Sequence, residues 1–331
     1  MGFQGFYGHK QIADELSASF ARGTNAHGYL FIGPAGCGKK TLARLCAQAL
    51  LCVRENGEKP CGQCRACKSF IAGTHPDLIE ISPEKGKTAI SITQIRDLIN
   101  QHISLRPYEG DKRAVIITGT ITPQAQNALL KTLEEPPKGN VIFITGQNTA
   151  QFLPTVLSRL RTYNLATADY EASILALTDK GIDRQKAALL SNVTDGNIGK
   201  AIELNESSVY WEMRDTALEI LRPMDKTELA GLLNKLNGYF ENAHMMLDII
   251  ETLLTDAQRS KANARIYMTD KQFEIERIAE NFSTCDISAL LDTVFQGRQR
   301  LSGMVNLQSP WQVVSERLLF KIVEVTKGWQ K

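Results

Sequence analysis

The residues that most directly indicate chemistry form a glycine-rich stretch that ends in two lysines. Gly33, Gly36 and Gly38 precede Lys39, and the outer glycines and the lysine have the spacing G-x4-G-K. Glycines let backbone amides approach phosphate oxygens, and the start of a following helix adds positive potential. Lys39 would place a point charge on the outer phosphates. The spacing predicts a nucleotide-phosphate loop; a glycine turn that binds nothing is the alternative.

The loop lacks the hydroxyl that normally follows the lysine and ligates magnesium. Lys40 occupies that position, and Thr41 comes one residue late. One residue on a helix corresponds to a rotation of ~100°, so the Thr41 hydroxyl is not expected at the same place. The pattern leaves nucleotide binding through Lys39 and the amides open, and it disfavours metal-assisted hydrolysis.

The acids that a phosphate-loop hydrolase needs are also missing from the expected strand ends. The predicted strands at 114–117 and 141–144 continue as Thr-Gly-Thr-Ile and Thr-Gly-Gln-Asn. Such a carboxylate would hold magnesium or polarise the attacking water. Asp111 precedes the first strand and lies at its wrong end. Unless the strand is misassigned, the sequence predicts a degenerate ATPase.

Four cysteines form a second cluster with chemical potential. Cys52, Cys61, Cys64 and Cys67 supply four thiolates on a short loop. Tetrahedral zinc suits this set, and a closed four-cysteine site has no open coordination position, so its role would be structural. An iron–sulfur cluster is the competing metal, and a disulfide is a weaker alternative in a reducing compartment.

The elements that must position these residues change character along the chain. Short apolar runs alternate with helical patterns in the first half, which predicts a parallel sheet with crossover helices. The later residues are predicted to be helical, with a turn at Gly196–Gly199 and a long amphipathic helix over Leu232–Leu254. The predicted strands cover residues 29–32, 77–81, 114–117 and 141–144.

The whole-chain composition excludes some classes of protein. The 331 residues carry a net charge of only +2, which argues against a surface that grips nucleic acid everywhere. No apolar run approaches the ~18 residues of a membrane helix, and the first residues lack the features of a secretory signal. We therefore expect a cytoplasmic protein with no membrane partner.

Several motifs together resemble a known family. These are the cysteine spacing and the stretches at 27–34, 75–80, 125–137 and 153–159. The combination resembles the clamp-loader subunits of bacterial DNA polymerase III, which belong to the AAA+ class, and among them the delta-prime family. The resemblance is dense over residues 1–165, whereas the remainder is similar only in length and helical character.

The resemblance implies a fold and a set of partners. It implies an AAA+ phosphate-loop α/β domain at 1–165 with a zinc module at about 52–67, a helical lid at 166–207 and an all-α collar domain at 208–331. It also implies a hetero-pentamer with gamma/tau and delta subunits that places a sliding clamp on primed DNA.

The resemblance further implies roles for single residues. Ser158 and Arg159 match a Ser-Arg motif whose arginine reaches into a neighbour's ATP site; an ordinary surface or salt-bridged arginine is the alternative. Lys200 is expected where motor subunits place a nucleotide-sensing arginine. Together with the missing acids, this favours a non-hydrolysing subunit that holds structural zinc and binds ATP, if at all, without efficient hydrolysis. A motor-type clamp-loader ATPase and an unrelated nucleotide kinase are the alternatives.

Overall fold

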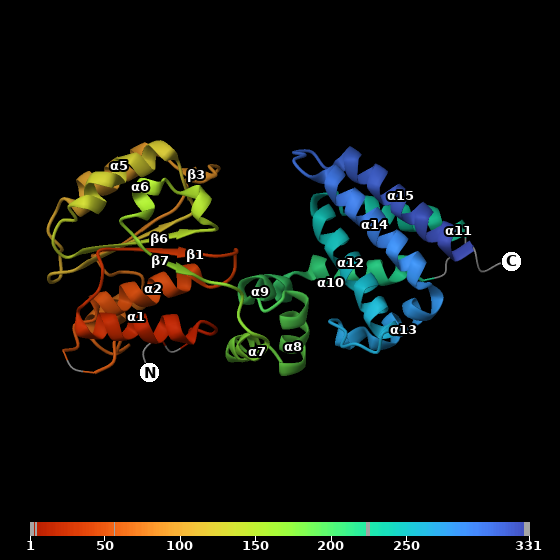
Figure 1. The fold of residues 1–331 in the computed structure, drawn as a ribbon, viewed down its shortest axis with the longest axis horizontal. Coiled ribbons are helices and arrows are strands. Elements are labelled where there is room, and N and C mark those ends of the chain that lie inside the picture. Colours follow the sequence, from red (N-terminus) through yellow and green to blue (C-terminus); the bar gives the residue numbers. More distant parts are fainter. Residues whose placement is uncertain (1–2, 4, 56, 223–225, 328–331) are drawn as a thin grey trace. The chain divides into compact units, whose positions relative to one another are not determined.

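The computed structural model describes residues 3, 5–55, 57–222 and 226–327, and these form two compact units (Figure 1). Unit 1 comprises Met1–Arg184 and Asp195–Lys200, and unit 2 comprises Gln185–Thr194 and Ala201–Lys331. The three-domain division with boundaries near residues 165 and 207 follows from the resemblance and remains a prediction.

A parallel five-stranded sheet forms the centre of unit 1. Its strand order is β2-β4-β6-β1-β7, and every neighbouring pair runs parallel. The strands are β1 (Gly28–Ile32), β2 (Leu78–Ile81), β4 (Arg113–Thr118), β6 (Asn140–Gly146) and β7 (Arg161–Asn164). Because parallel strands share one direction, the sheet has a carboxyl end and an amino end with separate sets of loops.

Successive residues of the central strands face opposite cores, as the period of a β-strand requires. Tyr29 and Phe31 of β1 pack with Phe143 against the layer of α1 and α2. Leu30 and Ile32 face the layer of α4, α5 and α6 on the other side. Both faces are therefore buried, which explains why the strands are apolar without alternation.

The helices of unit 1 begin where the sequence carries capping residues. The Ser91 hydroxyl accepts from the Gln94 amide in a capping box, and the Thr122 hydroxyl accepts from the Ala125 amide just before Pro123. The helices are α1 (Lys10–Arg22), α2 (Lys39–Leu51), α3 (Arg65–Ile71), α4 (Ile92–Leu98), α5 (Pro123–Glu134), α6 (Pro154–Leu157) and α7 (Tyr170–Asp179). A π-helical turn, Ile99–Ile103, continues α4.

Unit 2 is helical throughout its described residues. Residues 195–200, which include the start of α9, group with unit 1. The helices are α8 (Arg184–Val193), α9 (Ile198–Glu206), α10 (Ser208–Ile220), α11 (Lys226–Asn237), α12 (Ala243–Lys261), α13 (Gln272–Asn281), α14 (Thr284–Leu301) and α15 (Gln308–Lys327).

The single helix expected over Leu232–Leu254 is wrong, because the chain breaks between α11 and α12. A 3-10 turn, Phe240–Asn242, lies in the break. Gly238 precedes the turn, and a glycine inside a helix costs about 1 kcal/mol relative to alanine. The buried Trp311 of α15 then donates its indole N–H to the Leu236 carbonyl at 2.7 Å. Packing against α15 thus supplies a partner for the interrupted end of α11.

The predicted fold class is confirmed in its main lines. A parallel α/β sheet, an insertion with clustered cysteines between α2 and α3, and a helical remainder are all present. The strand β7 and a two-stranded sheet of β3 (Ala89–Ile90) with β5 (Thr120–Ile121) were not predicted. Among the described residues, no helix is long and apolar enough to cross a membrane.

Candidate functional site

The phosphate loop connects the carboxyl end of β1 to the first residue of α2, as its motif requires. Gly36 and Gly38 have φ values of 80° and 93°, which glycine adopts without strain. A Cβ at Gly33 would lie 2.0 Å from the Leu165 carbonyl oxygen. In addition, the Gly33 amide donates to the Gly146 carbonyl at the end of β6. The glycines are therefore needed for the loop to pass so close to its neighbours.

Lys39 is turned back onto its own loop. Its ammonium group donates to the Gly33 carbonyl at 2.8 Å and to the Pro34 carbonyl at 2.5 Å. The Nζ atom also lies 3.8 Å from the Cys37 sulfur. In this pose the charge stabilises the loop backbone. A phosphate would have to compete with two carbonyl groups for the ammonium.

The described structure places the residues at which a magnesium ligand was expected at the carboxyl end of the sheet. Lys40 and Thr41 are both exposed on the first turn of α2. The four residues that follow β4 and the four that follow β6 include no carboxylate. Glu80 is the acid on strand β2, but it is paired with Arg44 of α2, and β2 is the edge strand. Among the described residues that directly follow β4 and β6, the side chains include no carboxylate that could hold magnesium.

The turn Asp195–Lys200, here called the Asn197 turn, packs directly on the phosphate loop. Asn197 donates its side-chain amide to the Ala35 carbonyl at 2.7 Å, and the Gly199 amide donates to the Gly36 carbonyl at 3.0 Å. A Cβ on Gly199 would lie 2.5 Å from the Gly36 Cα. The backbone of Gly199 therefore lies against the loop, and the Lys200 amide nitrogen would lie 3.1 Å from a Cβ on Gly36. The Lys200 backbone amide donates to the side-chain oxygen Oδ1 of Asn197 at 3.0 Å.

The N-terminal segment covers another side of the loop. A Cβ on Gly38 would lie 3.2 Å from the Phe6 ring, and Tyr7 donates to Asp179 of α7. His9 forms a hydrogen bond with the Ala166 carbonyl at 3.0 Å. Phe6 and Asn197 were not predicted as site residues. No motif at Phe6 indicates its contact, whereas Asn197 lies in the turn that the sequence did predict.

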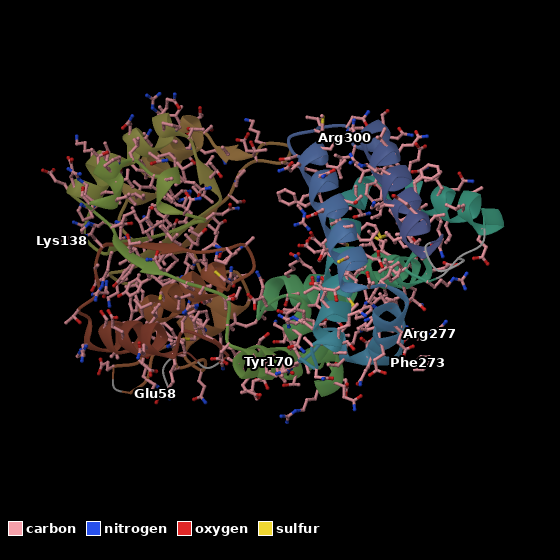
Figure 2. The ribbon with its side chains drawn as sticks, turned by 45° about the vertical axis from the view of Figure 1, so that its right-hand side comes forward. Glu58, Lys138, Tyr170, Phe273, Arg277 and Arg300 are labelled. Atoms are coloured by element: carbon pink, nitrogen blue, oxygen red, sulfur yellow. The ribbon has the colours of Figure 1, made fainter. Side chains whose placement is uncertain are left out.

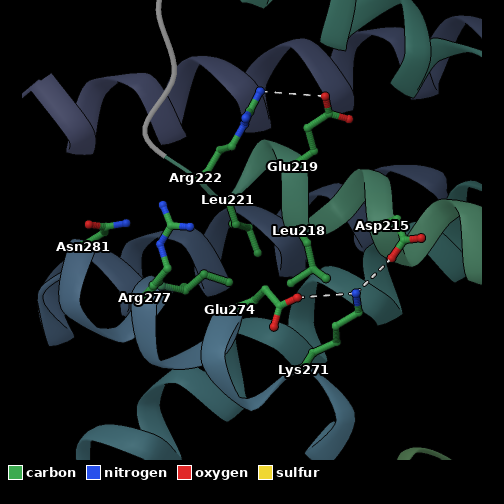
Figure 3. Close-up of a pocket in the computed structure, with 10 residues that line it drawn as sticks. Asp215, Leu218, Glu219, Leu221, Arg222, Lys271, Glu274, Arg277 and Asn281 are labelled. Atoms are coloured by element: carbon green, nitrogen blue, oxygen red, sulfur yellow. Dashed lines mark hydrogen bonds and ion pairs between the residues drawn. The ribbon is translucent and has the colours of Figure 1, made fainter.

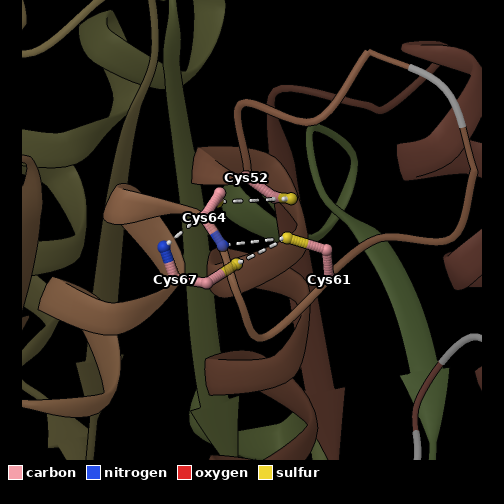
Figure 4. Close-up of side chains that lie close together, drawn as sticks. All are labelled: Cys52, Cys61, Cys64 and Cys67. Atoms are coloured by element: carbon pink, nitrogen blue, oxygen red, sulfur yellow. Dashed lines mark hydrogen bonds between the residues drawn. The ribbon is translucent and has the colours of Figure 1, made fainter.

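The four cysteines meet at the other end of helix α2 (Figure 4). Their sulfur atoms all lie within 4.8 Å of one another; the Cys52–Cys64 and Cys61–Cys67 pairs are 4.0 and 3.9 Å apart. Sulfur ligands of a tetrahedral zinc, each at ~2.3 Å from the metal, are about 3.8 Å apart. The cluster therefore fits a tetrahedral ion with little adjustment.

Backbone amides prepare the cysteine cluster for negative charge. The Cys64 amide donates to the Cys61 sulfur at 3.3 Å, and the Cys67 amide donates to the Cys64 sulfur at 3.4 Å. Burial opposes thiolate formation, but hydrogen bonds from the Gln63 and Cys64 amides and from neighbouring thiols lower the pKa of Cys61 to about 6. Burial raises the pKa of Cys67. Four closely spaced sulfurs with N–H donors could hold a metal ion.

Ser158 and Arg159 lie at the opposite end of the sheet from the phosphate loop. They follow α6 and precede β7, whose second residue, Thr162, is in register with Leu30 of β1. The Arg159 backbone lies beside Gly28, the first residue of β1. The Arg159 guanidinium donates to the Thr155 carbonyl, the Ser158 hydroxyl and the Glu134 carboxylate at 2.6, 3.2 and 2.6 Å. Arg159 is thus salt-bridged within its own chain and still 31% exposed.

A charged pocket in unit 2 does not form a comparable site. It encloses about 390 Å³ between α10 and α13, and Lys271 inside it lies 3.5 Å from both Asp215 and Glu274 (Figure 3). Arg277 also lines it, and its guanidinium stands 6.0 Å from the Phe273 ring on the same helix (Figure 2). Three cations and three carboxylates line the pocket, so it attracts neither charge strongly.

The chain is similar to known proteins along most of its length. The profile described as DNA polymerase III, delta subunit, matches residues 8–169, and a second profile, for the C-terminal part of the same family, matches residues 209–310. DNA polymerase III subunit delta' of Escherichia coli is 30% identical over 302 residues, which cover 89% of this chain and 88% of that protein.

Two further relatives match over most of this chain. Subunit delta' of Pseudomonas aeruginosa is 39% identical over 299 residues, covering 86% of this chain and 89% of that protein. DNA polymerase III subunit tau of Bacillus subtilis is 27% identical over 279 residues, covering 80% of this chain and 47% of that protein. Identity of 30% or more across nearly the full length of two delta' proteins shows that the chain belongs to the delta-prime subunit family of DNA polymerase III.

Proposed function

We propose that this clamp-loader subunit of DNA polymerase III does not hydrolyse ATP itself and donates Arg159 to the nucleotide site of a neighbouring subunit. It assembles in the cytoplasm with gamma/tau and delta subunits as a hetero-pentamer that loads a sliding clamp on primed DNA. The similarity to both delta' and tau proteins supports a place in this assembly.

The observation that carries the proposal is the placement of Arg159 at the far end of the sheet from its own phosphate loop. Strand β1 separates the two and has five residues. At ~3.3 Å per residue, it holds them about 16 Å apart. The side chain of Arg159 is much shorter than this distance, so it cannot reach from one end of the sheet to the other. The guanidinium therefore does not reach its own phosphate loop, which supports a role at a second subunit's nucleotide.

The phosphate loop supports the non-hydrolysing part of the proposal. Its amides and helix start suit nucleotide phosphates, but Lys40 replaces the hydroxyl and the neighbouring strand ends hold no acid. ATP bound there would lack magnesium ligands from the protein and a group that polarises water. ATP would thus act as a static ligand. The Asn197 turn would fix the loop with or without it.

Structural zinc in the cysteine cluster completes the proposal. Cys52, Cys61, Cys64 and Cys67 would each supply one sulfur, and zinc would neutralise part of the thiolate charge. The ion would link the carboxyl end of α2 to the start of α3. Zinc analysis of the purified chain should give one ion per chain. Cys64→Ser should lose it while Cys37→Ser keeps it, and a purified wild-type chain without zinc would reject the assignment.

The decisive experiment measures ATP hydrolysis by the reconstituted complex. A guanidinium that neutralises charge on a transferring phosphoryl group is worth ~10³–10⁵ in rate. Arg159→Ala should therefore abolish most hydrolysis at the one site that receives this arginine, with normal assembly of the complex. The purified chain alone should show only background magnesium-dependent hydrolysis. Unchanged hydrolysis in the Arg159→Ala complex would reject the arginine donor.

A further inference from the structure

We infer that Glu134 is a positioning residue for Arg159: its carboxylate holds the guanidinium in the outward pose from which it reaches a neighbour's nucleotide. The inference rests on the proposed function, because it concerns how the donated arginine is aimed. Glu134 is the last residue of α5, and Arg159 follows α6, so two separate elements create the pair.

The Arg159 guanidinium is restrained at two of its three nitrogens. Its NH1 group donates to the Thr155 carbonyl and the Ser158 hydroxyl, both within the same short segment. Its NH2 group donates to the Glu134 carboxylate at 2.6 Å. The first two contacts hold the guanidinium against its own segment. Of these three contacts, only the one with Glu134 fixes the NH2 group relative to an element outside the Arg159 segment.

Glu134 offers a fixed acceptor because α5 is bound to the Arg159 segment at its other end as well. The buried Gln126 side chain donates to the Ile121 and Gln151 carbonyls at 3.0 and 2.8 Å. It also accepts from the Leu153 amide at 2.8 Å, just before α6. The segment that carries Arg159 is therefore attached to α5 near its beginning and at its end. This double attachment keeps the carboxylate and the guanidinium in register.

The exposure of the pair indicates a role other than stability. The Glu134 side chain is 48% exposed and that of Arg159 31%. Pairs exposed to this extent contribute little to folding, because solvent screens them. A free arginine side chain, however, loses conformational entropy when it is immobilised. An arginine held in place before the neighbour arrives has already lost part of that freedom, so the neighbour's transition state gains more from it.

The test compares variants of neighbouring glutamates in the reconstituted complex. Glu134→Ala should lower kcat for ATP at the site that receives Arg159 roughly 3- to 10-fold. This is the effect of losing one charge-assisted contact. The KM for ATP should stay within about twofold, since the neighbour's own loop binds the nucleotide. Glu134→Gln keeps an acceptor oxygen in a side chain of the same shape. Its kcat should fall between those of the wild type and Glu134→Ala. Glu135→Ala is the matched control: Glu135 is exposed, follows Glu134 directly and should leave kcat unchanged.

The double variant separates positioning from other roles. If Glu134 acts through Arg159, adding Glu134→Ala to Arg159→Ala causes no further loss of kcat. A wild-type kcat for Glu134→Ala, beside a strongly lowered kcat for Arg159→Ala, would overturn the inference and leave the proposed function standing. A further loss in the double variant would also overturn it. An unaltered kcat for Arg159→Ala would instead reject the proposed function.

Discussion

The two ends of the parallel sheet differ in what they retain. At the carboxyl end, the phosphate loop has its glycines and its lysine, but Lys39 donates to carbonyls of its own loop. Lys40 stands where the magnesium-ligating hydroxyl is expected, and the residues that directly follow β4 and β6 include no acid. At the amino end, Arg159 is held by three acceptors and remains partly exposed. In the proposed function, the carboxyl end would bind nucleotide without hydrolysing it, and the amino end would supply an arginine to a neighbouring subunit.

The difference shows that the backbone of a phosphate loop and the side chains that would hold magnesium can be kept or lost independently. The phosphate loop is built from backbone that also packs against Leu165 and the Asn197 turn, so its shape serves the stability of unit 1. Magnesium ligands, by contrast, are side chains that contribute nothing to this packing. They can be absent while the loop keeps its form. The exposed pair of Arg159 and Glu134 likewise contributes little to folding, because solvent screens it.

The largest expected contrast comes from removing the two cations one at a time. In the reconstituted complex, Arg159→Ala should reduce hydrolysis at the receiving site by at least ~10³-fold, whereas Lys39→Ala should change turnover less than about twofold. The physical reason is that, in the proposed function, Arg159 would contact a reacting nucleotide, whereas Lys39 would belong to a loop that does not hydrolyse ATP. Single-turnover hydrolysis measures both. A strong loss with Lys39→Ala would show that the carboxyl end is catalytic after all.

A smaller effect is expected at the buried ion pair of the amino end. Asp77 is fully buried, accepts from the Tyr108 and Glu109 amides, and pairs with Arg113 at 3.0 Å. Asp77→Asn should lower the free energy of unfolding by about 3–5 kcal/mol, because it leaves the Arg113 charge buried without its counter-charge. Urea unfolding of the purified chain measures this loss.

The control for that variant is Glu109, whose backbone amide donates to Asp77. Glu109 pairs with the exposed Arg65 at 2.9 Å. Glu109→Gln should cost less than about 1 kcal/mol, since solvent screens the pair. Equal losses for the two variants would mean that burial does not govern the strength of ion pairs at this end of the sheet.

The smallest expected effect concerns the contact that holds the phosphate loop. Asn197→Ala removes the bond to the Ala35 carbonyl and the acceptor of the Lys200 amide. We expect a loss of about 1 kcal/mol and faster hydrogen exchange at the Gly199 and Lys200 amides, which correspond to two weakened hydrogen bonds. Asn205→Ala on α9, the helix that follows Asn197, is the control. Unchanged exchange at both amides would show that packing of Gly36 against Gly199 holds the turn alone.

Much of the fold was predictable because local signals agreed with tertiary packing. The apolar runs at 29–32, 114–117 and 141–144 are the centres of β1, β4 and β6, and both of their faces are buried. Capping by Ser91 and Thr122 was readable because a cap acts within three residues. The cysteine cluster was predictable since its members lie within one short loop.

Other elements depended on contacts that the local sequence does not show. Strand β7 has the polar sequence Arg-Thr-Tyr-Asn with only Tyr163 buried, and it forms because β1 offers an open edge. The break between α11 and α12 is satisfied by Trp311, which lies 75 residues from its acceptor, Leu236. In both cases a distant partner decides the structure.

The sequence by itself determined which groups each site has: a phosphate loop with Lys40 in place of a hydroxyl, strand ends without acids, four cysteines in close spacing and a Ser-Arg pair. Only the tertiary structure decided where they act. In the folded chain, Lys39 donates to its own loop and Asn197 donates to the Ala35 carbonyl. Arg159 pairs with Glu134 at the opposite end of the sheet. Composition is local to the chain, whereas the direction of a side chain depends on acceptors that folding brings from elsewhere.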